Sequence, residues 1–196
     1  MPVRDAVSTK EKILQAAFAE FTRRGFAGAR VDEIASRAKV NKALLYQHYA
    51  DKEALFRQVL ECKLAEVGEL ATDPERLPEL VGEFFDFHAE NRWLSRLTMW
   101  EALDYGTGPV PNEEERKKQF ADRVADFEEA QRLGVADPSL DAKQTVFTLI
   151  ASVSFWFAAP QIARMVTGED PYSAEALAAR RAHVVDAARR IMEVFK

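Results

Sequence analysis

The sequence predicts an all-α protein in which an N-terminal three-helix unit is followed by a larger helical unit. Apolar residues recur at spacings of three and four along most of the chain, which is the period of a helix with one buried face. No segment shows the sustained alternation of apolar and polar residues that is typical of a strand. With 196 residues, 47% of them hydrophobic, the chain is long enough to bury two cores. We expect about nine helices in two domains, residues 1–57 and 58–196.

The first helix is predicted from its two ends and from the apolar stripe between them. Ser8 and Glu11 have the spacing of a capping box, in which each side chain accepts a hydrogen bond from the other residue's backbone N–H. Gly25 is a natural residue to end the helix, because glycine adopts a left-handed backbone conformation without strain. The stripe between these ends comprises Ile13, Leu14, Ala17, Phe18 and Phe21.

Two shorter helices follow, joined by a tight turn. The first of them has an apolar face made of Val31, Ile34, Ala35 and Ala38. Asn41 is a favoured N-cap for the second, whose Leu44 and Leu45 then point inward. Its other face is polar, aromatic and basic, and consists of Lys42, Ala43, Tyr46, Gln47 and His48. Two helices with this layout form the helix-turn-helix that enters the major groove of DNA.

The first 57 residues resemble the DNA-binding domain of the tetracycline-repressor (TetR) family. The matching elements are Phe21 with Gly25-Phe26, Val31 to Ala35, Ala38 to Val40, Leu45 to Tyr49 and Lys52 to Leu55. The chain departs from the family where Ala29 and Arg30 replace the usual Thr or Ser that caps the second helix. It also has Lys39 in place of the turn glycine, and a left-handed conformation there would cost about 1–2 kcal/mol. These departures concern fine contacts rather than the fold.

The resemblance and the residue types together indicate which side chains would contact DNA. The alternative for each of them is an ordinary solvent-exposed position without a binding role. Tyr46 and Lys52 are expected to hold phosphates, and Arg30 and Lys39 to add positive charge near the backbone. The candidates for base edges are Lys42 for guanine, Gln47 for adenine, Ala43 for a thymine methyl group, and His48.

Positive charge is concentrated in the segment that is predicted to bind DNA. Residues 1–57 carry 11 Lys and Arg against 7 Asp and Glu, a net charge of +4 in a chain whose total is −5. The remainder of the chain is therefore strongly acidic. A basic head on an acidic body is expected when only one end of a protein meets phosphate.

The rest of the chain reads as helices separated by Gly and Pro. A long helix is predicted from Asp51, itself an N-cap, to about Leu70. Further helices are predicted over 79–88, 93–105, 113–133 and 173–195, with 106–111 as the clearest loop. In the helix over 113–133, the residues expected on the buried side are Phe120, Val124 and Phe127.

Residues 144–163 contain no charged residue, which leaves two interpretations. Twenty uncharged residues meet the length of a membrane span. Polar residues interrupt the segment, however, and Pro160 would kink it by obstructing the carbonyl of Trp156. We favour a helix buried on every side, with the domain core on one side and a partner subunit on the other. The resemblance implies the same arrangement, a homodimer formed through the last two helices.

The resemblance also implies a pocket for a small molecule in the second domain. Aromatic residues are frequent there, although core packing explains most of them. If the pocket exists, they make it apolar, with a few polar groups to orient a hydrophobic or aromatic effector that remains unidentified. The residues expected to line it are Phe84, Phe87, His88, Trp93, Trp100, Phe120, Phe127, Thr148, Ser152, Phe155 and Trp156.

These features favour a DNA-binding repressor that an effector releases from a palindromic operator in double-stranded DNA. Cys62 is the single cysteine, which excludes an internal disulfide and a cysteine-cluster metal site. We expect no catalytic residues, metal, cofactor or membrane anchor, and cytoplasmic residence, since no secretory leader is apparent. The alternatives are a helical enzyme or carrier that uses the aromatic cavity, and a protein-interaction module whose helix-turn-helix no longer binds DNA.

Overall fold

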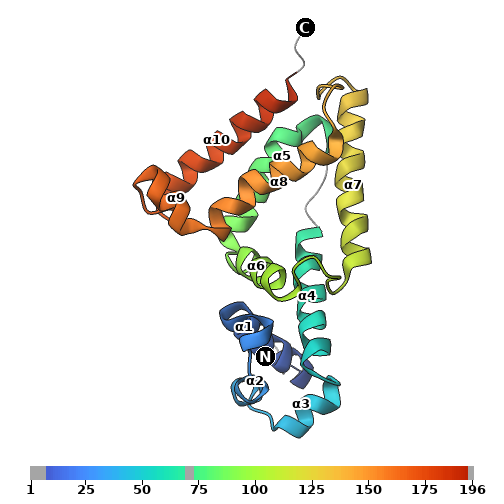
Figure 1. Ribbon diagram of the computed structural model, residues 1–196, viewed down its shortest axis with the longest axis vertical. Helices are drawn as coiled ribbons and strands as arrows, with labels where there is room; N and C mark the ends of the chain where they lie inside the picture. Colours follow the sequence, from blue (N-terminus) through green and yellow to red (C-terminus); the bar gives the residue numbers. More distant parts are fainter. Residues whose placement is uncertain (1–7, 69–72, 194–196) are drawn as a thin grey trace, which may run out of the picture. The chain divides into compact units, whose positions relative to one another are not determined.

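The computed structural model describes residues 8–68 and 73–193, and over these residues the protein is all-α (Figure 1). This part of the chain forms ten α-helices and one 3₁₀ turn. The helices are α1 Thr9–Gly28, α2 Val31–Ala38, α3 Lys42–His48, α4 Lys52–Gly68, α5 Leu77–Glu90, α6 Trp93–Tyr105, α7 Glu113–Arg132, α8 Ala142–Ala158, α9 Pro160–Thr167 and α10 Ala174–Met192. The predicted fold class is confirmed.

The chain divides into two compact units, and each unit consists of two separate segments of the sequence. The first unit comprises Met1–Gly68 together with Arg96–Glu113, and the second comprises Glu69–Ser95 together with Glu114–Lys196. Most of α6 therefore packs with the N-terminal helices. The predicted boundary at 57/58 stays a prediction.

Helix α1 begins with the predicted capping box. The Ser8 N–H donates to Glu11 Oε2 at 2.7 Å, and the Glu11 N–H donates to Ser8 Oγ at 3.2 Å. These bonds satisfy two backbone donors that the helix itself leaves free. The inner face of α1 is buried through Ile13, Ala17 and Phe21. Phe21 meets Phe56 of α4 edge-on, with the ring centroids 4.8 Å apart.

Gly25 interrupts α1 as expected, and at this position α1 packs closely against α6. Its φ of 70° and ψ of 178° lie outside the helical region, and one further turn follows before Ala29. A Cβ on Gly25 would lie 2.7 Å from the indole of Trp100. The neighbouring Phe26 N–H donates to Asp104 Oδ2 at 3.0 Å. The absence of a side chain at Gly25 thus lets the end of α6 close over α1.

The turn between α2 and α3 holds Lys39 in the left-handed conformation that the sequence comparison suggested. Its φ is 57° and its ψ is 41°. The Lys39 and Val40 N–H groups donate to the carbonyls of Ser36 and Ala35, which closes the end of α2. A lysine here costs about 1–2 kcal/mol relative to the helical region.

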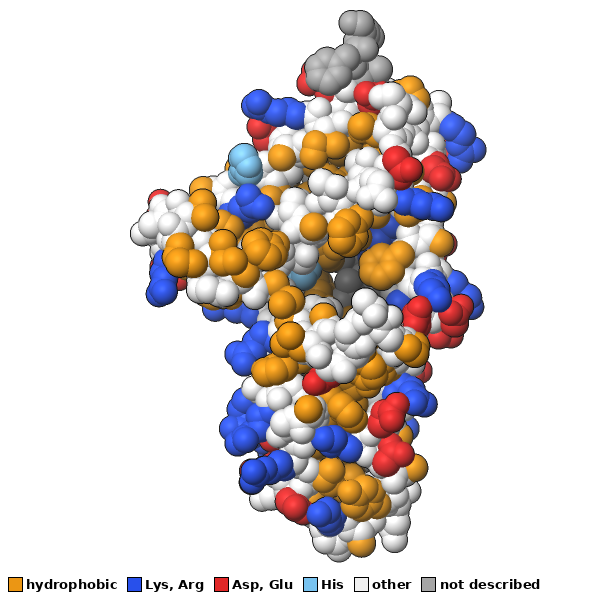
Figure 2. All heavy atoms as spheres, in the orientation of Figure 1, with side chains coloured by type: hydrophobic (Ala, Val, Ile, Leu, Met, Phe, Trp, Pro, Cys, Tyr) orange, Lys and Arg blue, Asp and Glu red, His pale blue; other side chains and the backbone are white. Residues whose placement is uncertain are grey.

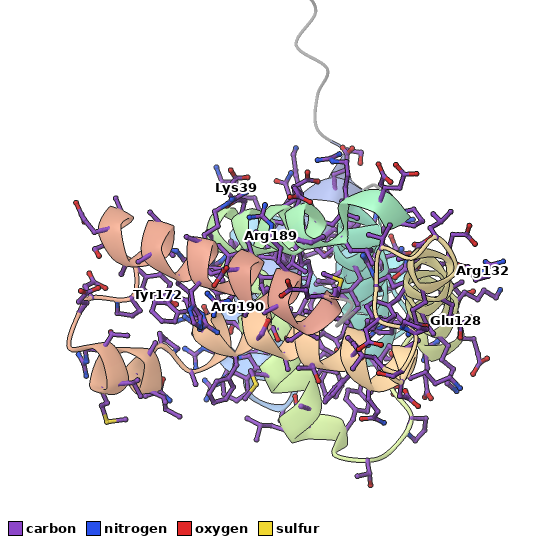
Figure 3. The ribbon with its side chains drawn as sticks, turned by 90° about the horizontal axis from the view of Figure 1, so that it is seen from above. Lys39, Glu128, Arg132, Tyr172, Arg189 and Arg190 are labelled. Carbon is purple, nitrogen blue, oxygen red and sulfur yellow. The ribbon has the colours of Figure 1, made fainter. Side chains whose placement is uncertain are left out.

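The second unit is built around α5, α8 and α10. Its core contains Phe85, Phe127, Val153, Phe157 and Val184. Two ion pairs join α10 to α5: Arg181 Nε donates to both oxygens of Asp86 at 2.8 Å, and Arg189 Nη2 donates to Glu79 Oε1 at 2.7 Å. Arg189 projects from α10 near its C-terminal end (Figure 3).

The uncharged stretch 144–163 is broken, which accounts for a tenth helix where about nine were expected. α8 ends at Ala158 and α9 begins at Pro160, as the predicted effect of that proline requires. The two helices are bent by 89°. No single helix among the described residues is long and apolar enough to cross a membrane, and only this bent pair meets the length and composition together.

Other predicted elements agree closely with the structure, with one exception. α6 and the 106–111 loop lie where the sequence placed them. The expected ends of two helices at Leu70 and Phe195 lie outside the described residues. Phe120 was expected on the buried side of its helix, and this is wrong, since 47% of its surface is exposed. Phe127, two turns further on, is the aromatic residue of α7 that enters the core.

Replacing Gly25 with alanine is expected to lower the free energy of unfolding by about 2–4 kcal/mol. The reason is that this backbone conformation is almost restricted to glycine and the new Cβ would overlap the Trp100 ring. Urea unfolding of the full chain measures the change. Gly28→Ala is the matched control, because the nearest atom, Arg24 Cβ, lies 3.4 Å away, so its effect should stay within about 1 kcal/mol. Equal effects of the two substitutions would contradict this account of Gly25.

Candidate nucleic-acid interface and ligand cavity

Helix α3 presents a continuous exposed face whose chemistry matches base and phosphate recognition. Leu45 is its one fully buried side chain, and Leu44 is partly buried. The opposite face is open to solvent and comprises all five residues that the sequence predicted to be outward: Lys42, Ala43, Tyr46, Gln47 and His48. The structure therefore brings these five side chains together on one surface.

Side-chain caps and buried anchors fix the orientation of α3. Asn41 Oδ1 accepts from the Leu44 N–H at 2.7 Å, as predicted for an N-cap. At the other end, Tyr49 is buried, and its N–H donates to the Leu45 carbonyl. Asp51 then starts α4 by accepting from the Ala54 N–H at 2.7 Å.

Lys42 forms an exposed ion pair with α2. Its Nζ lies 2.8 Å from Asp32 Oδ1. The hydrogen bond to that carboxylate, and then its charge, raise the pKa of the Lys42 ammonium group. Both side chains are largely in water, so the pair contributes little to stability. A contact of Lys42 with guanine, which stays a prediction, would replace the pair with Asp32.

Lys52 is engaged inside the protein in a way that the sequence did not reveal. Its Nζ donates to the carbonyls of Phe26, Ala27 and Ala29 at 2.8, 3.5 and 3.4 Å, and it lies 4.6 Å from the Phe26 ring centroid. These carbonyls follow the Gly25 break, where a positive charge is favourable. An ammonium group has three donors. The predicted phosphate contact of Lys52, which stays a prediction, would compete with these carbonyls.

Arg30 and Lys39 both have exposed side chains in the helix-turn-helix region, as a role near phosphate would require. Arg30 occupies the N-cap of α2, and its side chain forms no capping hydrogen bond. Basic side chains gather over this part of the first unit in the space-filling view (Figure 2). Their contacts with DNA stay predictions.

The second unit contains a small, mainly apolar cavity of about 90 Å³ between α5, α7 and α8. Its apolar walls come from all three helices, and α7 adds the two polar residues. The lining residues are Leu77, Leu80, Val81, Phe84, Arg123, Asp126, Phe127, Val146, Leu149 and Ile150. Sequence reasoning named Phe84 and Phe127 and missed the polar pair, because charged residues on an amphipathic helix usually belong to its solvated face.

The other aromatic residues expected around a pocket are dispersed. Trp100 belongs to the first unit, where it covers Gly25. Trp156 is buried and donates from its indole N–H to the Pro171 carbonyl at 3.1 Å. Phe120 and Phe155 are exposed, whereas Phe87 and Trp93 are half-buried, and the Trp93 indole donates to Asn91. None of these residues lines the described cavity.

The polar residues expected to orient a ligand have local partners. Thr148 Oγ1 donates to the Gln144 carbonyl at 2.8 Å, and Ser152 Oγ donates to the Leu149 carbonyl at 2.7 Å. His88 is buried against Phe84 and Phe157, with Nδ1 3.1 Å from Ser95 Oγ. Burial lowers the pKa of its imidazole to about 4, so His88 is neutral at pH 7. Their roles toward a ligand stay predictions.

Among residues 8–68 and 73–193, no group of three or more His, Cys, Asp or Glu side chains could hold a metal ion.

Two family models match most of the chain. Residues 13–59 match the model of the bacterial regulatory proteins of the tetR family, and residues 76–190 match that of the tetracyclin repressor-like C-terminal domain. The first match covers the capped α3 and its anchors. The second covers the cavity.

Similarity to individual proteins extends over the whole chain. The HTH-type transcriptional repressor SCO4008 of Streptomyces coelicolor is 37% identical over 194 residues, which are 98% of this chain and 100% of that protein. The crystal structure of the transcriptional regulator SCO4942 of Streptomyces coelicolor superimposes with a TM-score of 0.80 at 31% identity, covering 94% of this chain and 98% of that one. FadR of Bacillus subtilis, solved with stearoyl-CoA, shares the fold with a TM-score of 0.68 at 17% identity, covering 93% and 98%. The chain therefore belongs to the TetR family and is a DNA-binding transcriptional regulator rather than an enzyme.

Proposed function

We propose that this regulator is a repressor that binds a palindromic operator as a homodimer and leaves it when a hydrophobic small molecule occupies the second unit. The observation that carries the proposal is the exposed face of α3, on which five side chains suited to phosphates and base edges lie together. The full-length similarity to a protein named as a repressor supports repression over activation.

The residues of α3 divide into two roles toward DNA. Tyr46 presents its phenol at the edge of the exposed face, where it suits a phosphate. Gln47 can form paired hydrogen bonds with adenine, and Lys42 can donate to guanine. Ala43 would contact a thymine methyl group, and His48 lies at the end of the same face.

A homodimer is supported by exposed apolar side chains on α8 and α9, the two helices of the uncharged segment. The part of the final helix, α10, in the expected interface stays a prediction. Phe147 and Phe155 of α8 are 69% and 57% exposed, and Ile162, Met165 and Val166 of α9 are exposed as well. Orange side chains gather over these two helices in Figure 2. An apolar surface of this kind commonly marks an interface. Two copies related by a two-fold axis would read the two halves of a palindrome.

The cavity of the second unit supports release by a small molecule. FadR of Bacillus subtilis, which shares this fold, was solved with stearoyl-CoA, a ligand with a long apolar acyl chain. A ligand that binds one arrangement of the protein better would draw the population toward it. Moving the protein from mostly DNA-bound to mostly released takes about 5 kcal/mol of differential affinity. Because α4 directly follows α3 in the chain, a displacement of α4 would alter how α3 is presented.

We expect a palindrome-specific, salt-sensitive complex with the DNA upstream of the chain's own gene, measured by gel shift and fluorescence anisotropy. Gln47→Ala should lose about 1–3 kcal/mol of discrimination at one base pair in each half-site. Tyr46→Phe should weaken binding to all sequences alike, because a phosphate contact carries no sequence information.

Gln15→Ala is the matched control, since Gln15 is also exposed but lies on α1. It should leave both affinity and discrimination unchanged. A chain that forms no palindrome-specific complex at low salt would instead be a protein-interaction module.

Replacing Lys39 with glycine should separate stability from DNA binding. Glycine removes the strain of a left-handed lysine, but it also makes the unfolded chain more flexible. The net effect should raise the free energy of unfolding by up to about 1 kcal/mol. Loss of one positive charge should weaken DNA binding at all sequences and flatten its salt dependence. Lys39→Asn serves as a second variant, because asparagine tolerates this conformation and is also uncharged. If both variants bind DNA like the wild type, the Lys39 charge does not act on phosphate.

Phe155→Glu should convert the protein to a monomer in analytical ultracentrifugation. A carboxylate placed in an apolar interface would lose its hydration without gaining a partner. Affinity for the full palindrome should fall with it, while circular dichroism should remain helical. Leu133→Glu is the control, because Leu133 is 51% exposed but lies outside α8 and α9. A Phe155→Glu protein that stays dimeric would place the interface elsewhere.

A further inference from the structure

The cavity between α5, α7 and α8 has a polar feature that ordinary core packing does not explain. Asp126 lines it, and its Oδ2 atom is buried, yet that atom accepts no hydrogen bond from any residue that the structure describes. A buried acceptor without a donor costs about 1–3 kcal/mol, and more when it is charged. The carboxylate is thus available for a donor that a ligand would bring.

Arg123 stands one turn before Asp126 on α7 and also lines the cavity. Burial lowers the pKa of its guanidinium group, and the charge of Asp126 opposes that shift. The two side chains therefore bring charges of opposite sign to the same wall. Because Arg123 and Asp126 are the charged residues that line the cavity, the net charge of its lining is close to zero.

The remaining walls are apolar and include two aromatic rings. Phe84 comes from α5 and Phe127 from α7, and aliphatic side chains of α5 and α8 form the rest of the lining. The cavity has a volume of about 90 Å³ and is partly open to solvent, so it can hold a ligand of about one six-membered ring with part of the ligand outside.

We propose that this cavity takes a small, uncharged, mainly apolar ring compound that carries one hydroxyl or N–H group and donates it to Asp126 Oδ2. The inference deepens the proposed function, on which it rests, by naming the chemical class of the effector. A charged ligand of either sign would be attracted by one of these two side chains and repelled by the other. An uncharged donor satisfies the buried oxygen and leaves the opposite charges of Arg123 and Asp126 balanced.

Four probes of similar shape test the class: 4-ethylphenol, ethylbenzene, 4-ethylbenzoate and 4-ethylbenzylammonium. Their dissociation constants are measured on the full chain by titration calorimetry and ligand-observed NMR. We expect 4-ethylphenol to bind about tenfold or more tightly than ethylbenzene, the effect of one hydrogen bond to a charged acceptor. The two charged probes should bind more weakly than 4-ethylphenol.

Asp126→Leu should abolish the preference for 4-ethylphenol over ethylbenzene, and Asp126→Asn should reduce it while keeping the shape of the side chain. Glu128→Leu is the matched control, because Glu128 is exposed on the same helix (Figure 3) and should leave the preference intact. The inference is overturned if no probe binds, if a charged probe binds best, or if Asp126→Leu keeps the preference.

Gel shifts on the same preparations keep this outcome distinct from that of the proposed function. Palindrome-specific DNA binding without the phenol preference would overturn only the effector class. The phenol preference without palindrome-specific DNA binding would overturn the proposed repressor and leave the cavity assignment standing.

Discussion

The structure depends on the anchoring of a helix that is too short to stand alone. α3 has seven residues, whereas isolated helices shorter than about 12–15 residues are marginal in water. Its outer face must stay polar to meet DNA, so all of its stability comes from the inner side and the ends. Leu45 enters the core, Asn41 caps the first turn, and Tyr49 is buried just beyond the last one. The packing of α1 against α2 and α4 forms the core in which Leu45 and Tyr49 are buried. The exposed side chains of α3 keep their common orientation only while that core is intact.

Local rules predicted the first unit well because its turns are specified by neighbouring residues. The capping box at Ser8, the Asn41 cap and the left-handed Lys39 each follow from chemistry within a few positions. What the sequence could not give are contacts made over long separations. Lys52 was expected to face phosphate, yet its donors are engaged by carbonyls more than twenty positions earlier. No period or motif encodes that encounter, since it depends on how α1 and α4 pack.

In the second unit, the positions of the helices were predicted well, but which side chains would be buried, exposed or at the cavity was predicted less well. Spacing placed α7 and the break at Pro160 correctly, because both follow from the local sequence pattern. Aromatic content alone did not distinguish a cavity wall from a core or an exposed face. Phe127 is buried beside the cavity, while Phe120 on the same helix is exposed. The informative polar residues, Arg123 and Asp126, resemble any charged pair on a solvated helix until their burial is known.

The closure of α6 over Gly25 has a consequence for dissecting the protein. Trp100 and Asp104 reach α1 from more than seventy positions further along the chain, and they complete the packing around Phe26. A fragment truncated at the end of α4 would leave the indole site bare and the Phe26 amide without its carboxylate. The helix-turn-helix of this chain therefore cannot be isolated intact by a single truncation, because α6, which lies much later in the sequence, covers part of its core.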